Sequence, residues 1–162
     1  MSLEIELDQY IQGRRASVKE RELAHRLRQL PEEERFQLIW NLIQHSHIGL
    51  LFAKQCIRET KHFQTILERG LDVADASSIQ WWLDCVVSAL GVRRVLTTLK
   101  RTLTTNGLGV YKAVYYMRSV APNMDQEALA VLREIRADTR YRQIENDLYS
   151  RAYGKFGSPG AS

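Results

Sequence analysis

The sequence predicts an all-α protein, because two patterns recur along almost the whole chain. Apolar residues return every three or four positions, which places them on one face of a helix. No long stretch alternates apolar and polar residues between turn residues, as a half-buried strand does. Glycine, proline and asparagine divide the helical pattern into segments joined by very short turns, and such turns make neighbouring helices antiparallel.

Four helices are predicted in the N-terminal half. Gly13 suits the end of the first helix, and Pro31 suits the first turn of the third. A polar segment, residues 45–47, separates the third helix from the fourth, which we expect to continue unbroken until Gly70 ends it. The four helices span residues 2–12, 17–30, 31–44 and 48–69.

Four more helices are predicted in the C-terminal half. The segment 79–90 is apolar on nearly every side, so we expect it to be the most buried helix, at the centre of the protein. Trp81 and Trp82 point about 100° apart on this helix. One ring can therefore reach a surface groove, and Trp82 is assigned to the core. A bend is expected near Asp138. The four helices span residues 79–90, 92–105, 109–120 and 124–153.

The helix beginnings are almost regularly spaced, apart from one long step. This spacing resembles the helical-hairpin repeats of the HEAT and armadillo classes, and segment 91–96 (GVRRVL) resembles the Val-Arg beginning of a HEAT second helix. The resemblance implies antiparallel helical hairpins in a HEAT-like right-handed α-α superhelix; a compact orthogonal bundle is the alternative. We expect residues 1–153 to form a single helical domain, and residues 154–162, with three glycines and Pro159, to form a flexible C-terminal tail.

The composition is that of a globular chain of 162 residues, with 44% hydrophobic residues, 26% charged residues and a net charge of +4. Cys56 and Cys85 lie in apolar runs, where a free thiol behaves as a small hydrophobe. The N-terminus is acidic and lacks the apolar core of a signal peptide, so we expect a cytoplasmic protein. The uncharged stretch 36–53 carries polar residues at its middle, where a bilayer penalises them most, so no transmembrane segment is predicted.

The sequence carries no recognisable catalytic or cofactor motif. It has no Gly-x-Ser-x-Gly elbow, no Gly-x-x-x-x-Gly-Lys phosphate loop and no His-Glu-x-x-His zinc motif. His45 and His47 are potential metal ligands, but a site needs three or four convergent ligands, and two histidines at a helix break are more often a polar turn. We therefore predict that the protein is not an enzyme and uses no cofactor or metal.

The most unusual feature is a segment, Cys85 to Met124, with six basic residues and no acidic one. Its basic residues lie opposite the apolar stripe of the helix after Gly91, and the next helix adds tyrosines. Such a surface can bind an anionic partner, or it can be a solvated face balanced by acidic residues from elsewhere. The candidate partner-binding residues, called the basic face, are Arg93, Arg94, Lys100, Arg101, Tyr111, Lys112, Tyr115 and Arg118.

These observations together predict a non-enzymatic protein–protein interaction module, that is, an adaptor, a scaffold or an assembly subunit. The basic face favours an acidic protein surface as the partner. Nucleic acid is an alternative, but a nucleic-acid binder more often spreads its positive field over a wider footprint. The last helix alternates positive and negative residues, which makes it a candidate for homo-oligomerisation.

A further alternative comes from the segment 30–40 (LPEEERFQLIW), which resembles a helix from the N-terminal domain of orange carotenoid proteins. The resemblance covers 11 of the 162 residues. It implies a pocket for an apolar ligand or pigment.

Overall fold

A computed structural model describes residues 2–13 and 17–153, and these ranges form ten helices and no strand. The predicted all-α class is therefore confirmed, whereas the predicted tail, residues 154–162, lies outside the described residues. The helices are α1 (Leu3–Ile11), α2 (Ser17–Gln29), α3 (Glu32–His45), α4 (Ile48–Cys56), α5 (Thr60–Val73), α6 (Ile79–Leu90), α7 (Val92–Thr102), α8 (Gly107–Val120), α9 (Gln126–Ala137) and α10 (Thr139–Tyr153).

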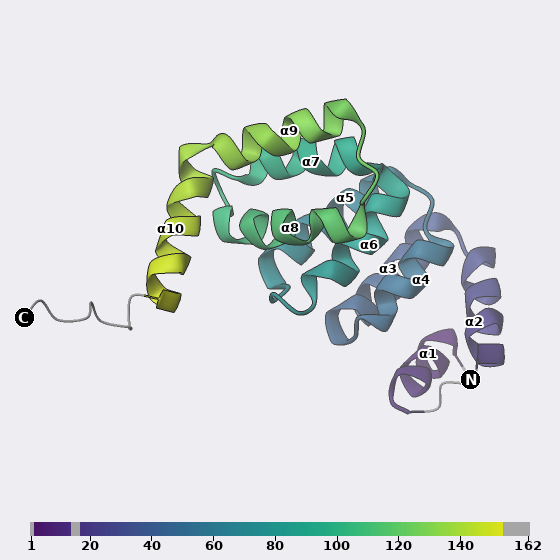
Figure 1. Cartoon of the computed structure of the whole chain (residues 1–162). Coiled ribbons are helices and arrows are strands. Elements are labelled where there is room, and N and C mark those ends of the chain that lie inside the picture. The colour runs from purple at the N-terminus through teal and green to yellow at the C-terminus, as the bar shows by residue number, and fades with distance from the viewer. Residues whose placement is uncertain (1, 14–16, 154–162) are drawn as a thin grey trace, which may run out of the picture.

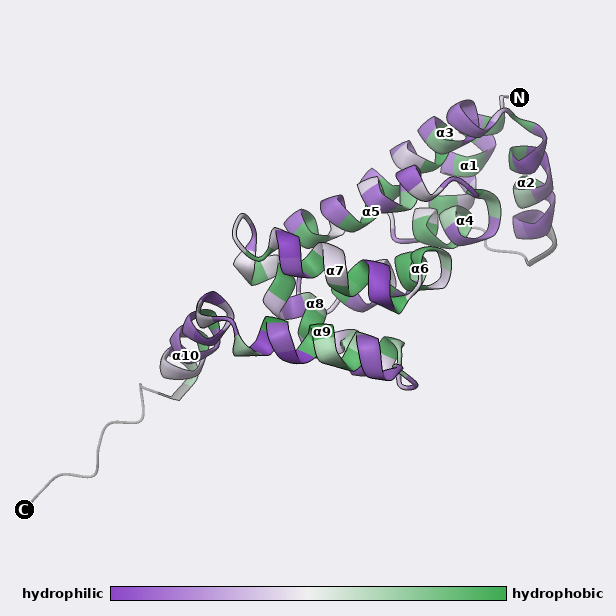
Figure 2. Cartoon of the chain, turned by 90° about the horizontal axis from the view of Figure 1, so that it is seen from above, coloured by the Kyte–Doolittle hydropathy of each residue, from purple (hydrophilic) through white to green (hydrophobic). Residues whose placement is uncertain are grey.

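The helices form an elongated arrangement, with α1 to α3 at one end and α10 at the other (Figures 1 and 2). Neighbouring helices pack as pairs, most extensively α3 with α4 and α5 with α6. Helices two apart in the chain also pack on each other, so that α4 contacts α6, α6 contacts α8, and α8 contacts α10. On the other side of these helices α7 packs on α9 in the same way. Within the described ranges, no helix has both the length and the hydrophobicity needed to cross a membrane.

Three polar contacts between helices share one sequence separation. Thr98 donates to Gln64 over 3.4 Å, Asn106 donates to Asp72 over 2.8 Å, and Lys100 donates to Glu134 over 2.6 Å. Each of these hydrogen bonds joins residues 34 positions apart. Other contacts between these elements span 32 residues, from Arg93 to Asp125, and 38 residues, from Lys112 to Ala74. The step between successive hairpins is therefore similar along the chain but not constant.

The predicted helix over residues 48–69 is wrong in two places. It is interrupted at Ile57, whose backbone is extended, and α5 begins only at Thr60. A carboxylate from α3 stabilises this break, because Glu32 accepts the backbone N–H groups of Arg58 at 2.7 Å and Glu59 at 3.0 Å. These N–H groups lie in the break, before the first residue of α5, so Glu32 satisfies backbone donors that neither helix pairs.

Gly70 was expected to end this helix but lies inside α5, which continues to Val73. It is buried where α5 meets α6, and a Cβ atom at residue 70 would lie 2.7 Å from Cε3 of Trp82. Gly70 is therefore present because the indole ring of Trp82 packs directly on its backbone.

Side-chain caps fix the beginnings of two helices in the C-terminal half. Asn106 accepts the N–H of Gly109 and starts α8 at Gly107. Asp125 accepts the N–H of Ala128, so α9 starts after it and later than the predicted residue 124. The bend expected near Asp138 is confirmed, because the helix stops there and α10 starts at Thr139.

The helix α6 lies at the centre of the protein as predicted, since it contacts α4, α5, α7 and α8. The predicted burial of Trp82 is confirmed, with 7% of the residue exposed. The prediction that it is the most buried helix is wrong, because five of its twelve residues are buried, against six of the nine residues of α4. The outward side of α6 is open to solvent and presents Trp81, which is 48% exposed. The apolar residues around this helix thus include some that are exposed to solvent.

Candidate docking groove

The basic face is only partly an open surface. On α7 the prediction is confirmed, because the apolar stripe of the helix is buried and its cationic side chains are exposed. On α8, Tyr115 and Arg118 are exposed, whereas Tyr111 and Lys112 are half-buried. The ring of Tyr111 packs on Tyr141 of α10 at 5.2 Å between centroids, and Lys112 donates to the carbonyl of Ala74 over 2.5 Å.

Acidic residues of α9 neutralise much of the charge that remains on α7. Arg93 forms ion pairs with Asp125, at 2.7 Å, and with Glu127, and Lys100 pairs with Glu134. The guanidinium of Arg93 also holds the pKa of the Asp125 carboxyl below its ordinary value. Among the described residues, four cations of the basic face have no carboxylate partner, namely Arg94, Arg101, Lys112 and Arg118.

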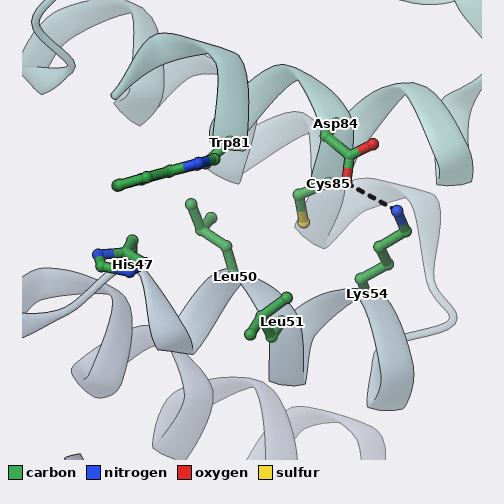
Figure 3. Close-up of a pocket in the computed structure, with 7 residues that line it drawn as sticks. All are labelled: His47, Leu50, Leu51, Lys54, Trp81, Asp84 and Cys85. Atoms are coloured by element: carbon green, nitrogen blue, oxygen red, sulfur yellow. Dashed lines mark hydrogen bonds and ion pairs between the residues drawn. The ribbon is translucent and has the colours of Figure 1, made fainter. Parts of the chain in front are cut away.

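A second surface feature lies between α4 and α6, where two large apolar side chains are half-exposed. Leu51 is 49% exposed on α4, and Trp81 is 48% exposed on α6. They border a groove of about 220 Å³ (Figure 3). The groove is lined by His47, Leu50, Leu51, Lys54, Trp81, Asp84 and Cys85.

Helical spacing explains why these residues face each other. On α4, Leu50 and Leu51 lie four and three positions before Lys54. On α6, Asp84 and Cys85 lie three and four positions after Trp81. The two helices pack together, so the two sets of side chains meet across the groove.

A contact between two rings closes one end of the groove, and an ion pair closes the other. At one end the ring of His47 lies under the indole of Trp81, with 4.1 Å between centroids and 31° between planes. At the other end Lys54 Nζ lies 2.7 Å from Asp84 Oδ2 (Figure 3). The middle of the groove is apolar, formed by Leu50, Leu51 and the buried thiol of Cys85.

The thiol and the carboxylate that line the groove are respectively buried and ion-paired. Burial raises the pKa of the Cys85 thiol to about 12, so it is protonated at neutral pH and packs as an apolar group. The carboxylate of Asp84 is engaged by Lys54. In the described part of the chain, no three His, Cys, Asp or Glu side chains are placed together to hold a metal ion.

Sequence reasoning allowed for one tryptophan at a groove but did not single out Leu51, Lys54 or Asp84. The local signal for Leu51 was present, because it lies off the buried face that Ile48, Phe52 and Cys56 form on α4. The pairing of Lys54 with Asp84 joins residues 30 positions apart and has no local signal.

Comparison of the chain with protein-family models, with curated proteins and with solved structures finds no match.

Proposed function

We propose that the protein is a helical protein–protein interaction module, and that the groove between α4 and α6 receives one bulky apolar side chain of its partner. The observation that carries this proposal is the pair Leu51 and Trp81, two half-exposed apolar side chains that border a preformed groove. Tryptophan is enriched among the residues that dominate binding energy at protein interfaces. An apolar centre with a polar rim is also the usual anatomy of such interfaces.

The size of the groove favours a protein side chain over a small-molecule ligand. Sites for small molecules and cofactors typically measure about 300–1,000 Å³. The groove, at about 220 Å³, lies below that range and suits a single anchoring side chain. It therefore gives little support to the apolar-ligand or pigment alternative.

The charges at the rim define the partner further. Lys54 and Asp84 neutralise each other, so the groove presents no net charge from this pair. A charged anchor would lose its hydration against Leu50, Leu51 and Cys85 without gaining a counter-ion. The complementary partner is a protein segment with an uncharged apolar anchor, such as leucine, phenylalanine or methionine, flanked by polar residues that hydrogen-bond to the rim.

The architecture supports the same class of function. The serial packing of α4 on α6, α6 on α8, α8 on α10 and α7 on α9 favours a HEAT-like superhelix of antiparallel hairpins over a bundle closed around one centre. Repeat proteins of this kind present extended surfaces for partners. We accordingly place the protein among non-enzymatic adaptors, scaffolds or assembly subunits.

A peptide library displayed on phage tests the proposal. Peptides selected on the wild-type protein are expected to share a bulky apolar residue, and to bind Trp81→Ala and Leu51→Lys at least about tenfold more weakly. Leu108→Lys is the matched control, because Leu108 is 52% exposed on α8, away from the groove, and its substitution should leave binding unchanged.

Two results would overturn this assignment. Selected peptides that bind Leu51→Lys as tightly as the wild type would place the docking site elsewhere. A dimer in sedimentation velocity that dissociates on Leu51→Lys but not on Leu108→Lys would make a second copy of the chain the occupant.

A further inference from the structure

The cations of the C-terminal third gather where three helix ends meet. The last turn of α7, the last turn of α9 and the first turn of α10 lie at the bend between α9 and α10 (Figure 1). Hydrogen bonds link these ends, because Lys100 reaches Glu134, and Arg142 Nε donates to the carbonyl of Arg136 over 3.4 Å. We call this region the α9–α10 corner, and its cations are Lys100, Arg101, Arg133, Arg136, Arg140 and Arg142.

The corner carries a large excess of positive charge. Residues 100–102 and 133–142 contain six basic residues but only two acidic ones, Glu134 and Asp138. The excess of four equals the formal net charge of the whole chain, so the rest of the chain is neutral as a whole. A positive field is thus concentrated at one place on the molecule.

Both acidic residues of the corner are already engaged. Glu134 pairs with Lys100 at 2.6 Å, and Asp138 pairs with Arg140 at 2.9 Å. Asp138 also accepts the backbone N–H of Arg140 at 2.9 Å. Across the described ranges, four cations of the corner have no carboxylate partner: Arg101, Arg133, Arg136 and Arg142.

Helix stability does not account for all of these cations. Lys100, Arg101 and Arg136 lie in the last turns of helices, where a positive charge is favourable. Arg140 and Arg142 instead lie near the N-terminus of α10, whose first turn has no acidic residue. A positive charge is unfavourable at that end of a helix. Asp138 offsets it for Arg140, with which it pairs at 2.9 Å, but no carboxylate of the described residues pairs with Arg142.

We propose that the α9–α10 corner binds an acidic segment of a partner protein. Carboxylates fit the forked guanidinium groups of the corner, which bind them through paired hydrogen bonds. The excess charge is confined to one corner, whereas a nucleic-acid binder spreads its cations over a wider footprint. The corner is built from α7, α9 and α10 and shares no residue with the groove between α4 and α6, so the two sites can be tested independently.

Fluorescence anisotropy with a labelled synthetic peptide of Glu, Asp and Leu tests this inference. The wild-type protein should bind this peptide at low salt, bind it more weakly as salt rises, and not bind the counterpart in which Lys replaces the acidic residues. Arg101→Gln/Arg133→Gln should weaken binding about fivefold to tenfold. Both residues are exposed and unpaired, so the thermal midpoint should change by only a few degrees.

The matched control is Arg94→Gln/Arg118→Gln, which removes the same charge from the part of the basic face outside the corner. It should leave binding within about twofold of the wild type, as should the groove variant Leu51→Lys. Equal losses of peptide binding in the two double variants would mean that net charge, and not the α9–α10 corner, determines binding, and would overturn the inference. Failure of the wild type to bind the acidic peptide, or tighter binding of poly-uridine RNA that the corner variant loses, would also overturn the inference.

Discussion

The indole ring of Trp82 lies directly on the backbone of Gly70, with no room for a side chain between them. The contact joins the two most extensively packed neighbours in the fold, α5 and α6. It also places Trp82 in the core and leaves the adjacent Trp81 on the outer side, at the groove.

Gly70→Ala should therefore destabilise the protein, although alanine is the better helix former. Alanine gains about 1 kcal/mol in helix propensity. The methyl group, however, meets Cε3 of Trp82 at 2.7 Å, and overpacking of this kind costs about 1–3 kcal/mol. We expect a net loss of about 1 kcal/mol in urea unfolding with an unchanged m value. Thr65→Ala on the exposed side of the same helix should be neutral or slightly stabilising, and a stabilised Gly70→Ala protein would contradict the close packing.

The two adjacent tryptophans should differ sharply in their contribution to stability. Trp82→Ala removes a buried ring and should cost about 3–5 kcal/mol. Trp81→Ala removes a half-exposed ring and should cost about 1 kcal/mol or less, while weakening peptide binding at the groove. Chemical unfolding followed by circular dichroism measures both values. Similar losses for the two variants would mean that Trp81 is part of the core.

The contribution of Glu32 to stability should depend on pH. Burial alone would raise the pKa of this carboxyl, but the N–H groups of Arg58 and Glu59 and the nearby guanidinium of Arg35 lower it below its ordinary value. A lowered pKa in the folded state adds stability above the unfolded pKa of about 4.3, and this stability is lost as the pH falls through the folded value.

Glu32→Gln should thus cost about 1 kcal/mol at pH 7, and the difference from the wild type should vanish at acidic pH. Glu34→Gln, at an exposed neighbour in the same first turn of α3, is the matched control and should leave the free energy of unfolding near that of the wild type. Thermal unfolding between pH 7 and pH 3 measures both, and a difference that persists at low pH would mean that the charge of Glu32 is not what stabilises the break before α5.

Asn106 and Asp72 offer a test of the contact between the end of α5 and the beginning of α8. Asn106→Asp keeps the cap on α8 but places two carboxylates together where the amide now donates to Asp72 over 2.8 Å. We expect a loss of about 1–2 kcal/mol, because a charge-assisted hydrogen bond becomes a repulsion. The double variant Asp72→Asn/Asn106→Asp should recover most of the wild-type thermal midpoint. Additive losses would show that the two side chains do not interact.

Local patterns in the sequence predicted the features that depend on one helix at a time. The burial of Leu96 and Leu99, the core position of Trp82 and the bend at Asp138 all follow from helical spacing or from residue types at helix ends. The features that failed depend on residues far apart in the chain. The break at Ile57 rests on a carboxylate from α3, and nothing near residue 57 in the sequence indicates it.

The same limit applies to the candidate sites. The basic face looked uncompensated because its acidic partners, such as Glu134, lie 34 residues away on α9. The excess charge of the α9–α10 corner was hidden because its arginines alternate with Glu134 and Asp138 in the sequence. Only the pairing of those carboxylates shows which cations remain unpaired.

The serial packing of helices two apart has a consequence for how the length of this protein can change. Because α4, α6, α8 and α10 contact one another in series, adding or removing a hairpin would require new contacts only at its two neighbours. A bundle closed around one centre would have to be rebuilt after such a change. The separation between the apolar groove and the basic corner would then vary with the number of hairpins between them.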